Sequence, residues 1–442
     1  MDDTSEGIER GGGSDDWGRR ALGVFPDGSN GEFGFPPGLA PVIARGEGAR
    51  VWDTSGREYW DLTMAWGSAL VGHAHPKIRE AVIGAVSDGY NFAGVNRRGV
   101  ELAERLQSLV PCAERVRFVA SGTEATLMCL RVAQAATQRP KVLKFEGAYH
   151  GQHPVGVTSM LNGRSVTLPR SDPSGAGAGW VERDVLVAPF NDLATTVRIL
   201  ETHCREIAAV IVEPLHRCLA PQPGFLQGLR EATRRLGIVL VFDEVVTGFR
   251  FGLSGAQGFF GVTPDLAAFG KALGGGFPIG AYAGRSDLME VVNEQRLPGP
   301  NYAWSASTTG GNPISCAAAM AALDIYSEPG CYDRLHETGT RFRSILESVL
   351  LSTETKGQVL GLGPLAQVAF ASHPVFDQQT WLASDRARGR RVMLELVRGG
   401  IYLNPMGTKL YLSLFHSDDV LQRFGAEFQR ALIVTSNPGN QR

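Results

Sequence analysis

The amino-acid sequence predicts an α/β protein, with a mostly parallel central sheet in a large domain and a smaller α+β domain. Residues 208–212 (AAVIV) and 238–242 (IVLVF) are unbroken apolar runs, which are typical of strands buried on both faces. Helix-like segments separate such runs, and this alternation is typical of a parallel sheet covered by helices. The chain beyond about residue 320 is rich in helical patterns and predicts the smaller domain.

The N-terminal part predicts a loose arm followed by short strands. Residues 1–40 are rich in Gly, Ser, Asp and Pro, and we expect about the first 20 to lack packed structure, because this composition buries little apolar surface. Further along, glycine turns and alternation predict strands, and helical periodicity predicts two helices. The expected strands are 42–45, 49–52 and 58–60, and the expected helices are 76–88 and 98–109.

The middle of the chain predicts the alternating elements of the large domain. Gly237 is expected to end a helix, because glycine readily adopts the left-handed conformation there. The run 171–179 (SDPSGAGAG) predicts a mobile loop that is either disordered or a lid over a site. The expected strands are 116–120, 141–145, 208–212 and 238–242, the expected helices are 123–137 and 225–236, and the tail adds strands at 366–370 and 410–414.

A chain of 442 residues exceeds one minimal core, so we expect more than one domain. Residues 1–75 are assigned to an N-terminal arm and a segment that joins the small domain. Residues 76–320 form the expected large domain, and residues 321–442 form the small C-terminal domain.

The composition argues against several classes of protein. A net charge of -2 argues against a nucleic-acid partner. No apolar run is long enough for a membrane-spanning helix, so we expect no membrane partner. The six cysteines are scattered without a C-x-x-C pair, which favours reduced thiols. With no signal-peptide pattern at the start, we expect a cytoplasmic protein. We expect no metal site, because His73 and His75 lack a third ligand at zinc spacing.

A turn after the strand 116–120 is suited to bind an anion. The motif Ser121-Gly122-Thr123-Glu124-Ala125 begins a helix, where free backbone N–H groups and the positive helix end favour phosphate. Gly122 permits close approach of the backbone, and the hydroxyls of Ser121 and Thr123 are further donors. The spacing of Ser121 and Glu124 also fits a capping box, so this motif alone leaves both interpretations open.

Two further residues carry chemistry that this motif lacks. Asp243 ends an apolar strand, where α/β folds bind ligands, and its carboxylate suits a cation, a metal or a protonated ring nitrogen. Its alternative is a supporting or helix-capping role. Lys271 closes an apolar stretch before three glycines, and a lysine in an apolar pocket can form a Schiff base. The alternative is a lysine on a loop. Together with a phosphate cradle, the two residues are the anchors that pyridoxal phosphate needs.

These motifs resemble those of the class III aminotransferases, and within them most closely the glutamate-1-semialdehyde 2,1-aminomutases. The resemblance covers nearly the whole chain past residue 40 and implies the fold-type I architecture of pyridoxal-phosphate-dependent transferases. The motifs that carry it, besides the 121–125 turn, are Phe145-Glu146-Gly147-Ala148-Tyr149-His150-Gly151, residues 241–250 (VFDEVVTGFR), Lys271 with its glycines, Trp66-Gly67, residues 308–313 (TTGGNP) and residues 400–403 (GIYL).

The resemblance implies a role for each matched residue. Lys271 would form the internal aldimine with the cofactor and then move the proton of the substrate, and Asp243 would pair with the pyridinium nitrogen. Val245 and Tyr149 would lie on the two faces of the ring, although Val245 is equally a candidate core residue. The remaining expected cofactor contacts are Ser121, Gly122, Thr123, His150 and Glu213, with Thr308 reaching the phosphate of the neighbouring subunit in a homodimer with shared active sites.

The expected substrate pocket departs from the aminomutase pattern. Trp66 is matched to an aromatic wall, with plain core packing as its alternative. The serine and arginine with which the aminomutases hold the substrate carboxylate fall on Gly31 and Gly34, and an acidic pocket residue falls on Lys409. Glycine offers no replacement for a guanidinium that binds a carboxylate with two hydrogen bonds. The segment after Glu213 is shorter, and His216 is the first candidate for a contact to the ring hydroxyl.

We therefore expect a pyridoxal-phosphate-dependent aminotransferase. It would move an amino group from a small-molecule donor to an oxo acceptor by ping-pong chemistry, and neither substrate is identified by the sequence. The alternatives are a glutamate-1-semialdehyde 2,1-aminomutase, which needs no external donor, and an amino-acid racemase or epimerase of the same fold. A remote alternative is a non-catalytic binding protein, which has no reason to retain the Schiff-base lysine.

Overall fold

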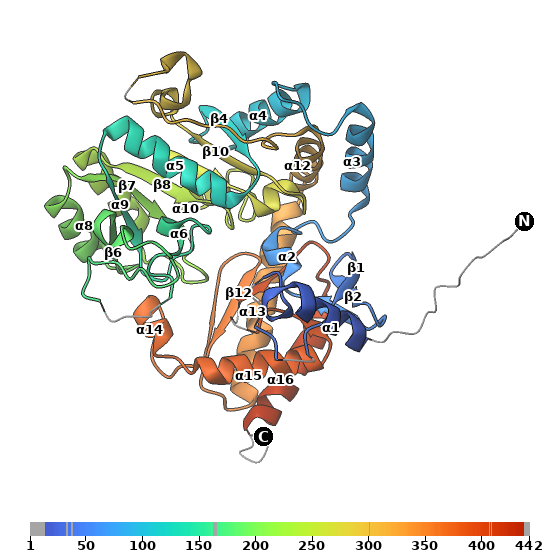
Figure 1. Ribbon diagram of the computed structural model, residues 1–442. Coiled ribbons are helices and arrows are strands. Elements are labelled where there is room, and N and C mark those ends of the chain that lie inside the picture. Colours follow the sequence, from blue (N-terminus) through green and yellow to red (C-terminus); the bar gives the residue numbers. More distant parts are fainter. Residues whose placement is uncertain are drawn as a thin grey trace, which may run out of the picture.

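The computed structural model describes residues 14–31, 34–36, 39–161, 166–299, 301–405, 407 and 409–436. Its largest sheet has seven strands in the order β4-β10-β9-β8-β7-β5-β6 (Figure 1). The pairs from β9 to β6 are parallel, whereas β10 runs antiparallel to both β4 and β9, so the predicted mostly parallel α/β sheet is confirmed. These strands are β4 (Arg115–Val119), β5 (Lys141–Phe145), β6 (Val185–Ala188), β7 (Ile207–Val212), β8 (Val239–Asp243), β9 (Leu266–Phe269) and β10 (Gly280–Gly284).

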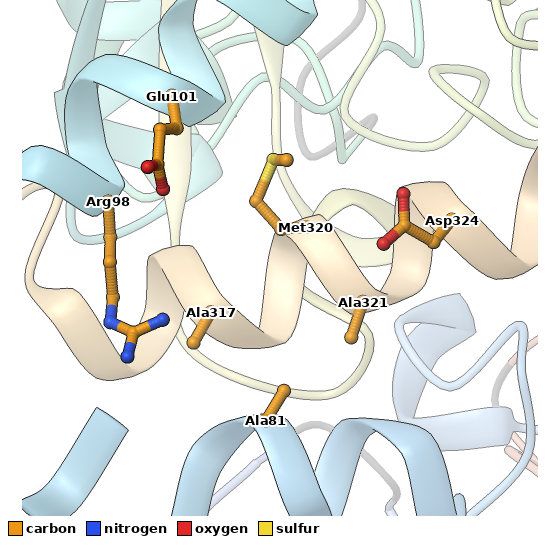
Figure 2. Close-up of a pocket in the computed structure, with 7 residues that line it drawn as sticks. All are labelled: Ala81, Arg98, Glu101, Ala317, Met320, Ala321 and Asp324. Atoms are coloured by element: carbon orange, nitrogen blue, oxygen red, sulfur yellow. The ribbon is translucent and has the colours of Figure 1, made fainter. Parts of the chain in front are cut away.

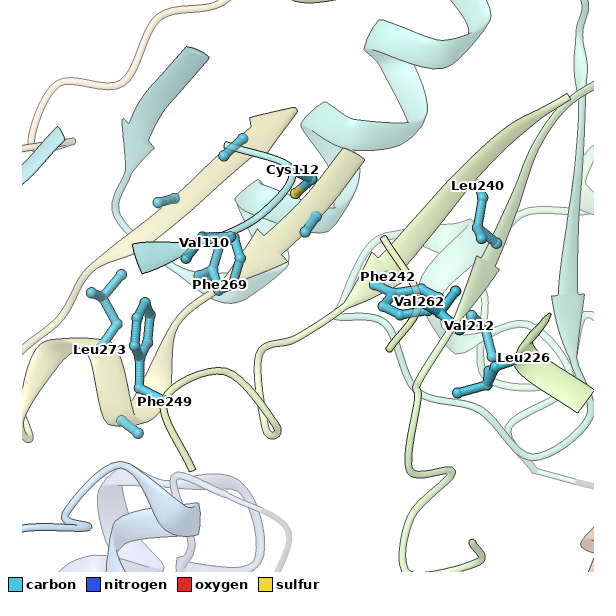
Figure 3. Close-up of a cluster of buried hydrophobic side chains, with 14 of the residues drawn as sticks. Val110, Cys112, Val212, Leu226, Leu240, Phe242, Phe249, Val262, Phe269 and Leu273 are labelled. Carbon is cyan, nitrogen blue, oxygen red and sulfur yellow. The ribbon is translucent and has the colours of Figure 1, made fainter. Parts of the chain in front are cut away.

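The central strands are buried on both faces, because alternate side chains of a strand face opposite sides of the sheet. Leu240 and Phe242 of β8 pack in one apolar cluster with Leu226 of α9 (Phe225–Leu236), and Figure 3 shows part of this cluster. Val241 packs on the other face with Val132 of α5 (Gly122–Thr137). Helices therefore cover both sides of the sheet, as the unbroken apolar runs predict.

Further helices lie between and beside the strands of this sheet in the sequence. Gly237 follows α9 in the left-handed conformation, with φ of 61°, and ends the helix as expected. The other helices of this part of the chain are α3 (Pro76–Asp88), α4 (Arg97–Leu109), α6 (Pro154–Val157), α7 (Val181–Asp184), α8 (Leu193–Thr202), α10 (Gly255–Phe260), η2 (Lys271–Gly274), α11 (Ser286–Met289), η3 (Glu290–Val292), η4 (Glu294–Arg296) and α12 (Pro313–Tyr326).

The C-terminal part has a second apolar core between three long helices and two small sheets (Figure 1). Phe342, Leu396 and Phe428 lie in this core and come from α13, α15 and α16, respectively. The elements are α13 (Cys331–Ser352), α14 (Gln378–Leu382), α15 (Arg386–Arg398) and α16 (Asp418–Ser436), the sheet of β1 (Ile43–Glu47), β2 (Arg50–Asp53), β3 (Glu58–Asp61) and β13 (Ile401–Tyr402), and the sheet of β11 (Gln358–Leu360), β12 (Leu365–Ala369) and β14 (Lys409–Tyr411).

Segments from the two ends of the sequence meet in this second part. Strand β13 pairs in parallel with β3, and the backbone N–H of Tyr411 donates to the carbonyl of Leu62 at 2.9 Å. Residue 320, where we expect the large domain to end, lies inside α12, and the buried side chains of that helix pack in the cluster of the large sheet. The division into domains stays a prediction.

The expectation of a loose arm is wrong, whereas the expectation of a mobile loop or lid at residues 171–179 stays a prediction. The expected loose arm contains helix α1 (Ser14–Val24) from residue 14 on, followed by η1 (Pro26–Gly28), and residues 1–13 lie outside the described part. In the run 171–179, Ser171 and Asp172 are buried, and the Asp172 side chain accepts hydrogen bonds from both the backbone and the hydroxyl of Ser174. This carboxylate orders a turn that the glycine-rich composition does not reveal.

Among the described residues, no helix combines the length and the apolar character that a membrane crossing requires. The same residues contain no group of three or more His, Cys, Asp or Glu side chains able to hold a metal ion.

Candidate active site

Asp243 and His150 form a buried pair at the carboxyl end of β8. The Nδ1 atom of His150 lies 2.7 Å from Asp243 Oδ2, and the backbone N–H of Val245 donates to Asp243 Oδ1 at 3.1 Å. Because a carboxylate only accepts, Nδ1 of His150 carries the proton. The Nε2 atom of His150 is buried and has no hydrogen-bond partner among the described residues. The pair therefore fixes one carboxylate in the interior of the protein, directly after a parallel strand.

Lys271 follows the neighbouring strand β9 and begins η2. Its φ of 45° lies in the left-handed region, which is uncommon for a residue with a side chain and is typical of functional sites. Burial lowers the pKa of the Lys271 amine below its usual value; Tyr411 and Asp243 act in the opposite direction, and Lys409 adds to the lowering. Lys271, Asp243 and Lys409 thus act on one another electrostatically in one site.

The first turn of α5 lies beside these residues. The Ser121 side chain caps the helix by accepting from the backbone N–H of Glu124 at 3.2 Å. The Glu124 carboxylate accepts from Ala120 N at 3.1 Å instead of from Ser121 N, so the reciprocal capping box is not formed. The backbone N–H groups of Gly122 and Thr123 belong to the first turn, where a helix provides no internal acceptors. They remain suited to an anion.

Glycines permit close packing between the turn before α5, the ends of β8 and β9, and the histidine segment. A Cβ atom on Gly122 would lie 2.7 Å from Cγ1 of Val245, and one on Gly270 would lie 3.4 Å from the Cα of Gly122. A Cβ atom on Gly151, whose φ is 104°, would lie 2.7 Å from the Cα of Thr123. The glycines therefore bring the turn before α5, the end of β8 and the histidine segment into one cradle.

Glu213 anchors the opposite side of this cradle. Its carboxylate accepts from the backbone N–H groups of Tyr149 at 3.0 Å and Arg217 at 3.2 Å. Burial would raise the pKa of Glu213, but the charge of Arg217 and the nearby histidines outweigh it and lower the pKa to about 2. Glu213 is therefore ionised and holds Tyr149 in place. The guanidinium of Arg217 also lies 5.9 Å from the centre of the Tyr149 ring and donates to the carbonyl of Gly147.

Lys409 and Tyr411 come from β14 and reach the same site. The Nζ atom of Lys409 lies 5.2 Å from the centre of the Tyr411 ring, and the guanidinium carbon of Arg250 lies 5.6 Å from it. Burial would raise the pKa of the Tyr411 phenol, but the charges of Lys409, Lys271 and Arg250 outweigh it and lower that pKa. A Cβ atom on Gly67 would lie 2.6 Å from the Tyr411 ring, so the backbone after Trp66 packs directly on this phenol.

Trp66 lies in a strained turn. The four residues of α2 (Met64–Gly67) have φ values of 43°, 51°, 58° and 83°, all in the left-handed region, and the Trp66 side chain is 36% exposed. Such strain persists only where the surrounding structure holds it, and it clusters at functional sites. The geometry contradicts plain core packing for Trp66 and leaves its place in a substrate pocket a prediction.

The structure places the remaining sequence candidates less centrally. Thr308 is exposed, and its carbonyl accepts from Asn91 Nδ2 at 2.8 Å. Gly34 accepts a hydrogen bond from the Arg390 guanidinium, whereas a Cβ atom on Gly31 would meet no atom within 4 Å. His216 is fully buried and stacks on Phe190, with ring centres 4.8 Å apart.

Comparison with known proteins matches residues 37–432 to the family model of the class III aminotransferases. The chain belongs to the class III aminotransferase family. A glutamate-1-semialdehyde 2,1-aminomutase from Lachnoclostridium phytofermentans is 39% identical over 87% of this chain and 91% of that protein. An omega-transaminase from Sphaerobacter thermophilus is 36% identical, with a TM-score of 0.88 over 97% of this chain and 99% of that one. A transaminase solved with pyridoxal phosphate bound is 29% identical, with a TM-score of 0.86 over 96% of this chain and 97% of that one.

The cofactor of this aminotransferase family member is pyridoxal phosphate, and the residues present fit it. The turn before α5 offers N–H groups for a phosphate, and the glycine cradle leaves room for a flat ring beside Val245. A buried carboxylate suits a protonated ring nitrogen, and a half-buried lysine of lowered pKa suits an aldehyde. The sequence prediction of the family, the enzyme class and the cofactor is confirmed.

Sequence reasoning missed Arg217 and Tyr411 as residues of this aminotransferase site. A signal for Tyr411 existed, because residues two apart on a strand share a face and Lys409 was already a candidate. Arg217 adjoins His216, the residue that the sequence singled out, but lies over the Tyr149 ring.

A separate groove of about 190 Å³ lies between α3, α4 and α12 (Figure 2). None of the site residues lines it. It is bordered by Ala81, Arg98, Glu101, Ala317, Met320, Ala321 and Asp324.

Proposed function

We propose that this protein is an aminotransferase that moves an amino group from a donor to an oxo acceptor in two half-reactions. The observation that carries the proposal is the electrostatic coupling of Lys271, whose pKa burial lowers, with Asp243 at the ends of the adjacent strands β9 and β8. When bound, pyridoxal phosphate supplies an aldehyde that takes up an amino group and a ring that withdraws electrons from the substrate carbon.

The residues around the cofactor have distinct proposed roles. The N–H groups and hydroxyls of Ser121, Gly122 and Thr123 bind the phosphate at the positive end of α5. Val245 and Tyr149 hold the ring between them, and Glu213 fixes Tyr149 through its backbone N–H. These contacts orient the reacting atoms before any bond is broken.

Asp243 and Lys271 carry the proton chemistry. The Asp243 carboxylate, held by His150 Nδ1, keeps a proton on the ring nitrogen of the cofactor. The Nζ atom of Lys271 would hold the cofactor before the reaction, and during it would take a proton from the substrate carbon and deliver it to the former aldehyde carbon of the cofactor. Burial favours the neutral, proton-accepting form of that amine.

The substrate pocket supports amino transfer to an external acceptor. Gly31 and Gly34 lack the hydroxyl and guanidinium that the aminomutase pattern requires, and Lys409 brings a positive charge close to Lys271 and Glu213. We propose that Lys409 binds an acid group of the acceptor, beside the wall that Trp66 and Tyr411 form.

A second candidate function is that of a glutamate-1-semialdehyde 2,1-aminomutase, which the names of the curated relatives favour. A screen of amino donors and oxo acceptors separates the two. For an aminotransferase we expect turnover to require both partners: the donor alone should change the absorbance of the enzyme, and the acceptor added afterwards should restore it. Efficient donor-free conversion of glutamate-1-semialdehyde to 5-aminolevulinate would contradict the proposal and establish the second candidate.

We further propose a homodimer with shared active sites. Exposed Thr308 would reach the phosphate of the partner subunit. Hydrogen bonds from Asn91 and Asn96 to the carbonyls of Thr308 and Gly311 join its segment to residues 90–96. Large apolar side chains are exposed in residues 83–95 and 297–304, which include or precede these segments, and such patches are typical of protein interfaces. They are Ile83, Val86, Tyr90, Phe92, Val95, Leu297 and Trp304.

A further inference from the structure

Lys144 of β5 is a buried lysine that the proposed chemistry does not use. Its side chain is fully buried, and its Nζ atom donates to four backbone carbonyls. The distances are 3.0 Å to Ala148, 3.3 Å to Val155, 2.8 Å to Gly156 and 2.6 Å to Thr158. In the part of the chain that the structure describes, Lys144 forms no ion pair, so its charge is balanced by carbonyl dipoles.

This set of acceptors selects the charged form of the side chain. An ammonium group has three N–H donors and no lone pair, whereas a neutral amine would direct its lone pair at a carbonyl oxygen. A hydrogen bond from a charged donor is also about twice as strong as a neutral one. The protonated Lys144 therefore draws residues 148–158 together around one point.

The same segment presents two cofactor contacts of the proposed site. Tyr149 follows directly on the Ala148 carbonyl, and the ring of His150 reaches Asp243. We propose that Lys144 is a positioning residue whose ammonium group holds the segment 146–158 in the shape that presents Tyr149 and His150 to the cofactor. We call this contact of the Lys144 ammonium group with the four carbonyls the clamp. The part that Tyr149 and His150 play in the reaction rests on the proposed function, but the clamp itself does not.

The clamp is sensitive to pH. Burial lowers the pKa of Lys144 from 10.5 to about 7. The charges of Glu213, after β7, and Asp243, at the end of β8, act to raise it, and that of Arg217 acts to lower it. In return, the charge of Lys144 contributes to the lowered pKa values of His153 and His216. The adjacent strand β6 (VLVA) carries no titratable side chain. Deprotonation near neutral pH would release the carbonyls and loosen the segment.

The test compares cofactor release from the full-length holoenzyme at pH 6 and pH 8.5. Lys144→Met keeps the length of the side chain and removes its charge. Lys141→Met is the matched control, because Lys141 lies on the same strand and pairs with Glu206 at 2.8 Å. At pH 6 we expect Lys144→Met to release the cofactor at least about tenfold faster than the wild type. That ratio should fall towards one at pH 8.5, with a midpoint near 7, while Lys141→Met stays like the wild type.

A merely structural role would raise the release rate by the same factor at both pH values, and this outcome would overturn the proposal. Hydrogen exchange in the wild type needs no variant and covers the case in which Lys144→Met fails to fold. After correction for intrinsic exchange, protection of residues 146–158 should fall from pH 6 to pH 8.5, and unchanged protection would equally overturn the clamp. If these tests confirm the clamp but the enzyme transfers no amino group, only the proposed function is contradicted and the clamp stands.

Discussion

Lys271 derives its proposed reactivity from position. It follows β9, the strand next to the one that ends at Asp243, its backbone is in the left-handed conformation, and burial lowers the pKa of its amine. A solvated lysine would stay protonated at neutral pH and could not take a proton from carbon. The proposed proton transfer therefore depends both on Lys271 and on the surroundings that lower the pKa of its amine.

The first prediction concerns this amine. Lys271→Ala should abolish amino transfer and the visible absorbance that depends on attachment of the cofactor to Nζ, while phosphate contacts still retain some cofactor. Steady-state kinetics and absorbance spectra of the purified variant measure both effects. Lys356→Ala, at an exposed position, is the control. Near-normal turnover in Lys271→Ala would remove Lys271 from the catalytic role.

The second prediction concerns Lys409. Losing a charge-assisted contact to a carboxylate costs about 1.5–3 kcal/mol, which is roughly ten- to a hundredfold in binding. Lys409→Ala should therefore raise KM for an acidic acceptor by about that factor and leave KM for a neutral acceptor nearly unchanged. An equal effect on both acceptors would show that Lys409 supports the pocket through Tyr411 instead of binding the substrate.

At the scale of elements, the turn before α5 combines two tasks. Ser121 caps the helix, and the first-turn N–H groups remain available for an anion. At the same turn Gly122 packs tightly against the side chain of Val245.

A third prediction follows from this approach. Gly122→Ala places a Cβ atom 2.7 Å from Val245 Cγ1, a distance that real Cβ atoms essentially never show, so the turn and the ring-facing valine must move apart. We expect at least about tenfold weaker retention of the cofactor on dialysis, with the thermal unfolding midpoint of the cofactor-free protein changed far less. Gly31→Ala, at an open position, is the control. Normal cofactor retention in Gly122→Ala would place the phosphate elsewhere.

The elements that the sequence predicts well are those that local patterns define. Strands β7 and β8 are apolar runs, and Lys271 and Asp243 follow strand ends within recognisable motifs. Strand β10 (GAYAG) escaped prediction because two glycines and two alanines give no apolar run, although its neighbours bury it completely. Tyr411 and Arg217 escaped because their place in the site depends on contacts with Gly67 and Tyr149, which are distant in sequence.

At the scale of the whole molecule, we predict that the active site is completed by a second subunit. Lys271→Ala and Thr308→Ala chains, combined in one heterodimer, leave one site with both changes and one site with neither. The isolated heterodimer should thus recover about half of the wild-type activity, well above either parent. A catalytically competent monomer in analytical ultracentrifugation would contradict this prediction, as would a heterodimer no more active than the Thr308→Ala parent.

The contact between Tyr411 and the segment 62–67 has a consequence for biosynthesis. All strands of the large sheet have been synthesised once the chain reaches Gly284, the end of β10. The parallel partner of β3, which is β13, is synthesised only at residues 401–402. The donor to the Leu62 carbonyl and the aromatic ring that packs on Gly67 both belong to Tyr411, which is synthesised later still. A nascent chain can therefore finish the cofactor-binding sheet while it is still attached to the ribosome. The proposed substrate wall of Trp66 and Tyr411 would be completed only near the end of translation, so a chain truncated after residue 400 would lack it.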